Sequence, residues 1–349
     1  MKNFYDVIVV GAGPAGIFTA LEIANKKPEL SVLIIDKGRN IEKRKCPARI
    51  NGKCVKCNPC GITYGWAGAG AFSDGKLSLS PEVGGRLLEY LSEDESKKLI
   101  KYCDDIYIEF GANEKVYGLN SDKVEDVKYE ASKHNIRLVE CPVRHLGTEL
   151  AYEVLKSMYH HLIDNTNTDF VELSEVEEII IEDNKATGVL LKNKDGVFKV
   201  NAKYVVAAPG RGGAEWIANE AKKHGIKVTN NAVDIGVRVE VPNSVMDHLT
   251  KDLYEAKLVY YSDTFGNKVR TFCMNPGGVV SAEYYDDNTI AVVNGHSYSD
   301  QKLRTNNTNF AMLVSTSFTE PFNQPIGYGK YIAQLGNMLT GGGKIGRAS

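Results

Sequence analysis

Three glycines near the start of the chain have the spacing of a phosphate-binding turn. Gly11, Gly13 and Gly16 follow the order G-x-G-x-x-G. In this pattern the first glycine permits a tight turn, the second lets the backbone approach a pyrophosphate, and the third lets a helix pack closely on a strand. The helix that begins here would offer backbone amides to the phosphates. The turn therefore predicts a dinucleotide site, with Pro14 and Ala15 as further members.

An acidic residue completes this pattern. Asp36 ends a second apolar run about 20 residues beyond the turn, where an acid accepts the ribose hydroxyls of a dinucleotide. An acid at this position predicts an adenosine ribose without a 2′-phosphate. Lys37 follows it as a further cofactor-binding candidate. The mixed run 41–45 is interpreted as a solvated turn in which Arg44 is a candidate phosphate contact.

Four of the seven cysteines are close together in the sequence: Cys46, Cys54, Cys57 and Cys60. The two-residue gaps between the last three, with a Cys-Pro pair before them, are typical of iron-sulfur ligation. A tetrahedral zinc ion would also accept four thiolates. A redox dithiol and unliganded cysteines remain alternatives. We expect a metal site here, with a 4Fe-4S cluster favoured over zinc.

Two histidines are candidates for proton transfer. His145 lies in the turn Pro-Val-Arg-His-Leu-Gly-Thr before a predicted helix, and His296 lies near the end of a predicted strand. An imidazole titrates near neutrality and suits general acid or base chemistry. The alternative is an ordinary loop or strand-end histidine whose ring is hydrogen-bonded to the backbone. His145 is the preferred catalytic candidate.

Two further residues have a reactive side chain. Arg238 lies in an alternating strand pattern and is placed to clamp a substrate carboxylate, although pairing with Glu240 on the same face is the preferred interpretation. Cys273 lies among small residues, where a buried and inert thiol is expected.

The elements that would position these residues alternate between strands and helices. The apolar run before the glycine turn and the run 32–35 predict strands, and the apolar spacing between them predicts a helix. A β-meander is predicted from three runs separated by turn residues: 170–181, 185–192 and 198–201. The apolar run 204–210 predicts a buried parallel strand that ends at a ligand, with Ala208 and Gly210 at that end.

The rest of the chain adds helices and longer strands. Helices are predicted from the apolar and charged spacing of four segments: 84–112, 123–134, 149–163 and 214–224. Residues 233–299 are rich in β-branched and aromatic residues and predict the core of an antiparallel substrate domain.

Composition excludes several classes of protein. The chain has 349 residues, 25% of them charged, with a net charge of −2 and no basic tract, which argues against a nucleic-acid partner. A strand pattern begins within the first few residues, and no apolar run has the ~18 residues needed to span a membrane. We therefore expect a cytoplasmic protein without a signal peptide or a membrane partner. The length suggests two domains.

Beyond these single motifs, the order of elements resembles flavoproteins of the glutathione reductase type. Three segments resemble more narrowly a group of bacterial FAD-dependent dehydrogenases: 68–76, 142–148 and 273–278. The late strand departs from the flavoprotein pattern, because it ends Ala-Ala-Pro-Gly where Ala-Thr-Gly is common.

The resemblance implies FAD as the cofactor and assigns further residues to it. Four residues of the glycine-rich run 65–77 would lie near the flavin ring: Gly70, Ala71, Phe72 and Ser73. Val176 would contact adenine through its backbone. Lys76 is a further catalytic candidate near the N1-C2 edge of the flavin, where a cation stabilises the reduced form, although an exposed lysine is the commoner explanation. Nothing after Pro325 matches the closing motif of such flavoproteins, so a shortened chain with weaker FAD binding is expected.

These observations predict an α/β protein with a Rossmann-like FAD domain, a parallel sheet plus a β-meander, and a mixed α+β substrate domain. The FAD domain is assigned to 1–80 and 142–232, and the helical insert and substrate domain to 81–141 and 233–349. The expected function is flavin-dependent oxidoreduction of a small-molecule substrate with a separate electron donor or acceptor. A non-catalytic dinucleotide-binding module and a flavin-free NAD-dependent enzyme remain alternatives.

Overall fold

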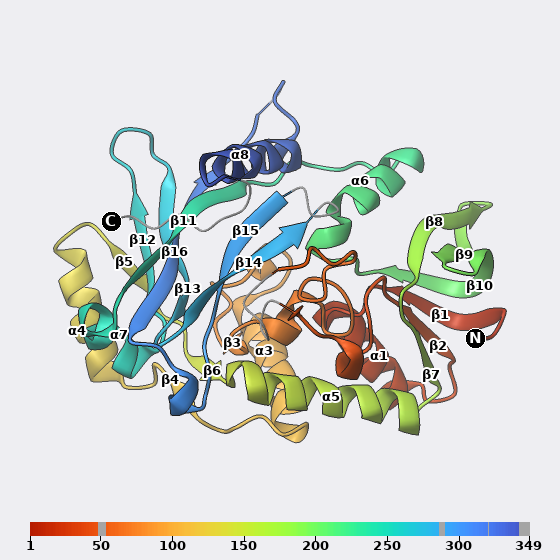
Figure 1. Ribbon diagram of the computed structural model, residues 1–349, viewed down its shortest axis with the longest axis horizontal. Coiled ribbons are helices and arrows are strands. Elements are labelled where there is room, and N and C mark those ends of the chain that lie inside the picture. Colours follow the sequence, from red (N-terminus) through yellow and green to blue (C-terminus); the bar gives the residue numbers. More distant parts are fainter. Residues whose placement is uncertain (48–53, 286–289, 320, 342–349) are drawn as a thin grey trace. The chain divides into compact units, whose positions relative to one another are not determined.

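The computed structural model describes residues 1–47, 54–285, 290–319 and 321–341 (Figure 1). The chain forms two compact units. The first unit comprises Met1–Ala71, Leu155–Thr229 and Glu283–Ala291, and the second comprises Phe72–Val154, Asn230–Ala282 and Val292–Ser349. Residues 342–349, on which part of the expectation of a shortened chain rests, lie outside the described residues.

A six-stranded sheet with the order β7-β2-β1-β10-β9-β8 organises the first unit. The first four strands in this order run parallel, and the last two pairings are antiparallel. The strands are β1 (Phe4–Val10), β2 (Val32–Ile35), β7 (Thr168–Val171), β8 (Glu175–Glu182), β9 (Lys185–Asn193) and β10 (Gly196–Ala207). This confirms the predicted fold class, with a parallel sheet extended by an antiparallel meander.

Burial explains the parallel half of the sheet. All four residues of β2 are buried, and β1 is buried over its last four residues, as expected for strands covered on both faces. The core of this unit includes Tyr5, Ile8 and Leu33 together with β9 and β10 side chains. The predicted run 198–201 and the residues 204–207 of the next run belong to one strand, β10, because its first half pairs with β9 and its second half pairs with β1. The prediction that the second run is buried is wrong, since Tyr204 is 65% exposed.

Three helices accompany this sheet along the chain. They are α1 (Pro14–Lys26), the C-terminal part of α5 (Gly147–Asn165) and α6 (Ala214–Lys223). Helix α1 buries Gly16, Ile17, Ala20 and Leu21, which recur at helical spacing and form one face. Short 3-10 turns complete the unit: η1 (Ile41–Lys43), η2 (Gly68–Phe72), of which 68–71 belong to this unit, and η4 (Arg211–Gly213).

The second unit contains a five-stranded antiparallel sheet with the order β11-β16-β13-β12-β5. Its strands are β11 (Val233–Pro242), β16 (Asn307–Thr316), β13 (Lys268–Asn275), β12 (Lys257–Tyr261) and β5 (Arg137–Val139). A smaller sheet has the order β3-β6-β4, with β3 (Lys76–Ser78), β6 (Val143–His145) and β4 (Val116–Tyr117). The antiparallel pairing predicted for 233–299 is confirmed.

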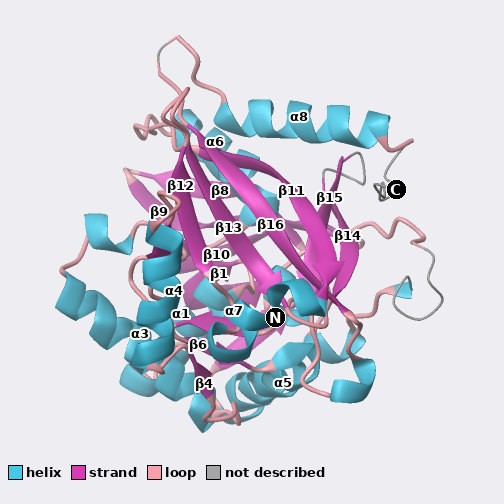
Figure 2. Ribbon diagram, turned by 90° about the vertical axis from the view of Figure 1, so that its left-hand side faces the viewer, coloured by secondary structure: helices cyan, strands magenta, loops and turns pink. Residues whose placement is uncertain are grey.

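Helices pack against the five-stranded sheet, as Figure 2 shows. Helices α7 (Asn243–Leu253) and α4 (Ser121–Ser132) pack against its strands, and α8 (Pro325–Leu339) lies along β11. Helix α3 (Glu93–Glu109) begins later than the predicted 84–112, because Ser92 and Glu95 form a capping box that fixes its first turn. The remaining elements are η3 (Leu87–Glu89), η5 (Gln301–Leu303), and the strand pair β14 (Val279–Tyr285) and β15 (Ile290–His296). In the described ranges, no helix combines the length and apolarity that crossing a membrane requires.

Candidate functional site

The glycine turn of the first unit has the close contacts that its sequence predicts. Gly11 has a φ of 104°, and a Cβ added to it would fall on the carbonyl oxygen of Ala208. A Cβ on Gly16 would fall on the carbonyl oxygen of Gly11 and lie 3.2 Å from the Val9 side chain. The predicted tight turn and the close helix packing are therefore confirmed, since neither position has room for a side chain.

The N-terminus of α1 is open to an anion. Gly13 is its N-cap residue, no side chain caps the helix, and the first turn contains no acidic residue. A Cβ on Gly13 would meet no atom within 4 Å, and Pro14 and Ala15 are exposed. Amides at a helix N-terminus carry a partial positive charge and lack helical acceptors. These residues fit a pyrophosphate.

Asp36 braces the same turn from the end of β2. Its carboxylate accepts hydrogen bonds from the backbone amides of Ala12 at 3.0 Å, Gly38 at 2.8 Å and Gly65 at 2.8 Å. A carboxylate has about four acceptor positions, so one position is left for a ribose hydroxyl. The Nζ of Lys37 lies 4.1 Å from the centroid of the Tyr64 ring and pairs with Glu175 at 3.7 Å.

The glycine-rich segment adjoins the turn in the first unit. The Ala67 amide donates to the carbonyl of Ala12 at 2.7 Å, and a Cβ on Gly68 would lie 3.4 Å from Gly13. Trp66 is fully buried, and its indole N–H donates to the carbonyl of Leu155 at 2.9 Å. This part of the segment therefore packs beside the predicted phosphate site.

The remaining cofactor-binding candidates fall in several places. Ala71 is buried in the first unit, and a Cβ on Gly70 would meet nothing within 4 Å. Val176 is buried in β8, and Gly210 follows β10 with a φ of 63°. Phe72 and Ser73 belong to the second unit, where the Ser73 carbonyl accepts from the Thr148 hydroxyl at 2.8 Å. Their contact with a flavin ring stays a prediction.

Arg44 has a different role from the one its sequence position suggested. Its guanidinium is buried, and it donates hydrogen bonds to the carbonyls of Gly61, Ile62, Trp66 and Gly68. These bonds use all five N–H donors of the guanidinium, so no donor is left for a phosphate. Burial lowers the pKa of Arg44 to about 10, and the group remains a cation at neutral pH. Arg44 instead holds the cysteine-rich and glycine-rich segments together.

Replacing Arg44 with Met should therefore destabilise the protein. The change leaves the acceptors at Gly61, Ile62, Trp66 and Gly68 without their donor, and we expect the free energy of unfolding to fall by about 3 kcal/mol. Urea denaturation of the flavin-free protein measures this. Arg39→Met is the matched control. Because Arg39 is exposed, this variant should keep the free energy of unfolding of the parent protein. Equal stability of the two variants would contradict this role.

The structure does not form the predicted metal site. Among the residues that the structure describes, no three His, Cys, Asp or Glu side chains converge as a ligand set. Cys46, Cys54, Cys57 and Cys60, all within the described residues, form no disulfide bond. Burial and the neighbouring cysteines raise the pKa of Cys57 above that of an ordinary thiol. The expectation of an iron-sulfur cluster or zinc at these residues is therefore not supported.

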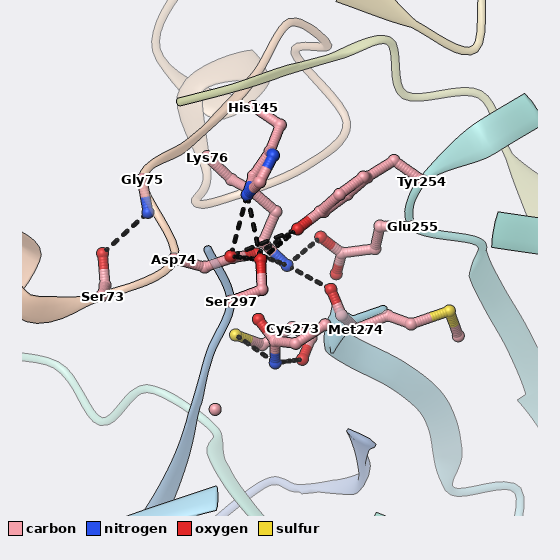
Figure 3. Close-up of polar contacts among 12 residues, drawn as sticks. Ser73, Asp74, Gly75, Lys76, His145, Tyr254, Glu255, Cys273, Met274 and Ser297 are labelled. Carbon is pink, nitrogen blue, oxygen red and sulfur yellow. Dashed lines mark hydrogen bonds and ion pairs between the residues drawn. The ribbon is translucent and has the colours of Figure 1, made fainter. Parts of the chain in front are cut away.

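A buried cluster of charges lies in the second unit (Figure 3). The ammonium of Lys76 lies 3.2 Å from the carboxylate of Asp74 and 2.8 Å from that of Glu255, and it donates to the Met274 carbonyl at 2.7 Å. Lys257 pairs with the other oxygen of Glu255 at 2.5 Å. The two ammonium groups of Lys76 and Lys257 balance the two carboxylates of Asp74 and Glu255.

Three further side chains form hydrogen bonds with the Asp74 carboxylate. His145 Nε2 lies 3.0 Å from its Oδ1, and the Tyr254 hydroxyl lies 3.2 and 3.1 Å from its two oxygens. Ser297 donates to the same carboxylate and lies 3.0 Å from His145 Nε2. The ring of His145 stacks on that of Tyr254 at 4.2 Å. Three side chains that can carry a proton therefore converge on one carboxylate.

The environment fixes the charge of these groups. Burial alone would lower the pKa of Lys76, but the electrostatic effects of Cys273, Glu255 and Asp74 outweigh it and raise that pKa. Burial would raise the pKa of Asp74, but Lys76 and hydrogen bonds from His145 and Ser297 hold it well below its usual range. Burial and the charge of Asp74 raise the pKa of Tyr254. Lys76 is thus a permanent cation, and Tyr254 stays protonated.

Backbone geometry brings this cluster together. Lys76 in β3 lies directly opposite His145 in β6, and Gly75 before it has a φ of 65°. A Cβ on Gly75 would lie 2.7 Å from the Gly147 carbonyl oxygen, so only glycine fits here. Sequence reasoning singled out Lys76 and His145 separately. It missed Tyr254, Glu255 and Ser297, which no local motif marks.

The three remaining candidates lie elsewhere in the second unit. Arg238 donates to Asn309 Oδ1 at 2.7 Å and to the Cys273 carbonyl at 3.2 Å, so the preferred pairing with Glu240 is wrong. Cys273 is half-buried rather than buried, at an irregularity in β13 where its φ is 50°. His296 is fully buried and bonds to the Ser281 hydroxyl at 2.5 Å, as expected for a structural histidine.

Two family models match separate parts of the chain. Residues 232–335 match the family described as FAD-dependent protein, C-terminal domain-like, and residues 6–46 match the lycopene cyclase protein family. The second match covers β1, the glycine turn, α1 and β2. These matches support an FAD-dependent protein.

Individual relatives are distant. An uncharacterized protein of Clostridium beijerinckii is 27% identical over 322 residues, 89% of this chain and 51% of that protein. Digeranylgeranylglycerophospholipid reductase of Methanosarcina mazei is 37% identical over 101 residues, 27% of this chain and 24% of the reductase. The match thus spans about half the length of the Clostridium protein and about a quarter of the length of the reductase. Among solved structures, glycine oxidase of Bacillus cereus has a TM-score of 0.42 at 16% identity, covering 93% of this chain and 76% of the oxidase.

Proposed function

We propose that this protein is an FAD-dependent oxidoreductase that acts on a small-molecule substrate. The observation that carries the proposal is the uncapped turn between β1 and α1, in a chain whose residues 232–335 match an FAD-dependent family. Gly11, Gly13 and Gly16 would hold the pyrophosphate of FAD, and Asp36 would accept a ribose hydroxyl. When bound, FAD supplies the transfer of a hydride or of single electrons.

The buried cluster of the second unit supplies the groups that can hold a proton. Tyr254 and His145 both bond to Asp74, and the fixed cation Lys76 keeps that carboxylate ionised. An ionised Asp74 orients the imidazole and the phenol that bond to it, as carboxylates do for acid and base groups in enzymes. We assign Lys76 and Asp74 positioning roles and His145 and Tyr254 the proton-bearing roles. A small-molecule substrate and a separate electron donor or acceptor complete the proposed reaction.

An absorbance spectrum of the purified protein tests the proposal. We expect a flavin band near ~450 nm that bleaches with dithionite, and we expect mass spectrometry of the acid-released cofactor to identify FAD. Protein that arrives without flavin should be reconstituted with FAD before the measurement.

Two results would overturn the proposal, each toward a different alternative. A bound flavin that no chemical or enzymatic donor reduces would indicate a dinucleotide-binding module without catalysis. Saturable binding of NAD without uptake of FAD would indicate a flavin-free enzyme.

A further inference from the structure

A cavity in the second unit has features of a ligand site, and of its lining residues the proposed function uses Tyr254 alone. Its volume is about 510 Å³, within the range of pockets that hold small molecules. Residues from β4, α7 and the segments around 276 and 304 line it. We propose that this cavity binds a small anionic molecule that carries a carboxylate or a phosphate group.

The charge of the lining favours an anion. Lys115, Lys251 and Arg304 line the cavity, and Asp247 is the one carboxylate among the lining residues. Asp247 pairs with Lys251 at 3.3 Å. Three cations against one carboxylate give the lining a net charge of +2. Within the described ranges no carboxylate forms an ion pair with Lys115 or Arg304, so their charges are available to a ligand.

Arg304 is held in place without using the donors at its tip. Its Nε donates to the Tyr298 carbonyl at 2.9 Å, and within the described residues neither of its two terminal amino groups donates a hydrogen bond. Those two groups form the end of the planar fork that binds carboxylate and phosphate oxygens in pairs. A guanidinium anchored at one nitrogen and open at the other two is suited to an anionic ligand.

The backbone around Arg304 is also fixed before a ligand arrives. The Thr305 amide donates to the Gly277 carbonyl at 2.8 Å. Asn243 bridges the same two segments, because its Oδ1 accepts from the Gly277 amide at 3.2 Å and its Nδ2 donates to the Thr305 carbonyl at 3.1 Å. Preorganisation of this kind reduces the entropy that binding costs.

Aromatic rings line the cavity beside these charges. Tyr117 and Tyr254 lie 5.2 Å apart between ring centroids, and the ammonium of Lys115 lies 4.4 Å from the centre of the Tyr117 ring. The flat faces of these rings suit an aromatic or other planar body attached to the anionic group. The Tyr254 hydroxyl also reaches Asp74, so a ligand here would lie against a member of the buried cluster.

Titration of ¹⁵N-labelled protein by NMR tests the proposal without any flavin. The probes are phenyl phosphate and benzoate, with benzyl alcohol as the uncharged analogue. We expect the backbone amide resonances of Gly277 and Thr305 to shift saturably with at least one anion. The protein should bind this anion at least tenfold more tightly than the alcohol. The tighter of the two anions identifies phosphate or carboxylate as the preferred group. Equal response to all three probes, or none, would overturn the proposal.

Variants separate a specific site from general attraction. Arg304→Gln should weaken binding of the better anion roughly tenfold, because a bidentate charged contact is lost. Lys302→Gln is the matched control, since Lys302 is exposed, two residues away and not in the lining, and it should change binding less than twofold. Lys115 lines the cavity and is exposed, so Lys115→Gln should fold normally and weaken binding about threefold. This variant tests the site even if Arg304→Gln fails to fold. Equal losses at Lys302 and Lys115 would contradict a defined site.

Discussion

Gly16→Ala should weaken FAD binding and also lower the free energy of unfolding, whereas Gly13→Ala should weaken FAD binding alone. A methyl group on Gly16 would fall on the Gly11 carbonyl and force α1 away from β1, so we expect a loss of about 3 kcal/mol in the free energy of unfolding. The same group on Gly13 touches no protein atom. It projects beside the open amides of α1, where a phosphate would lie, and should weaken FAD binding at least tenfold.

Both properties are measured on flavin-free protein, because a bound cofactor would itself raise the stability. Urea denaturation gives the free energy of unfolding, and titration with FAD gives the affinity. For Gly13→Ala we expect stability within about 1 kcal/mol of the parent, since a poorer N-cap is offset by a less flexible unfolded chain. Unchanged FAD affinity in Gly13→Ala would show that the phosphates bind elsewhere. An undiminished stability in Gly16→Ala would show that the close approach is wrong.

The glycine turn and the strands of the first unit were predictable because their signals are local. The glycine turn, the strand before it and the helix after it follow one another in 1–26, and each glycine has a steric reason that can be stated from its spacing alone. The meander was predictable for the same reason, since short turns join its strands, although its first predicted run, 170–181, divides into β7 and β8. Asp36 was found by its spacing, but its bonds to three backbone amides were not foreseeable, because Gly65 is 29 residues away.

The buried cluster of the second unit was only half predictable. Lys76 and His145 drew attention as chemically capable residues, yet nothing local shows that β3 and β6 place them opposite each other. Tyr254 and Ser297 meet Asp74 across 180 and 223 residues of sequence. Arg44 shows the converse error. Its charge suggested a phosphate, while burial makes carbonyl oxygens its partners.

Lys76→Met should be the most damaging single change in the second unit. The substitution leaves Asp74 without its cation and Glu255 with Lys257 alone, in a region where the side chains are almost fully buried. Removing one partner from a buried ion pair costs about 3–5 kcal/mol, because the remaining charge stays desolvated. Urea denaturation at pH 7 measures the loss. Lys203→Met is the matched control, since Lys203 pairs with Asp6 at the surface and should leave the midpoint unchanged.

The pH dependence of this loss distinguishes charge from packing. Burial opposes the ionised form of Glu255, but Lys76 and Lys257 outweigh it and lower its pKa to about 2. A depressed carboxylate pKa stabilises the folded state above the unfolded pKa of about 4.3, and this stabilisation is lost as the pH falls toward 2. In Lys76→Met the carboxylates should protonate at higher pH, so the stability difference between the two proteins should shrink from pH 7 to pH 3. A difference that stays constant over this range would mean that Lys76 acts through the packing of its side chain, and the assignment of a permanent cation to this cluster would be wrong.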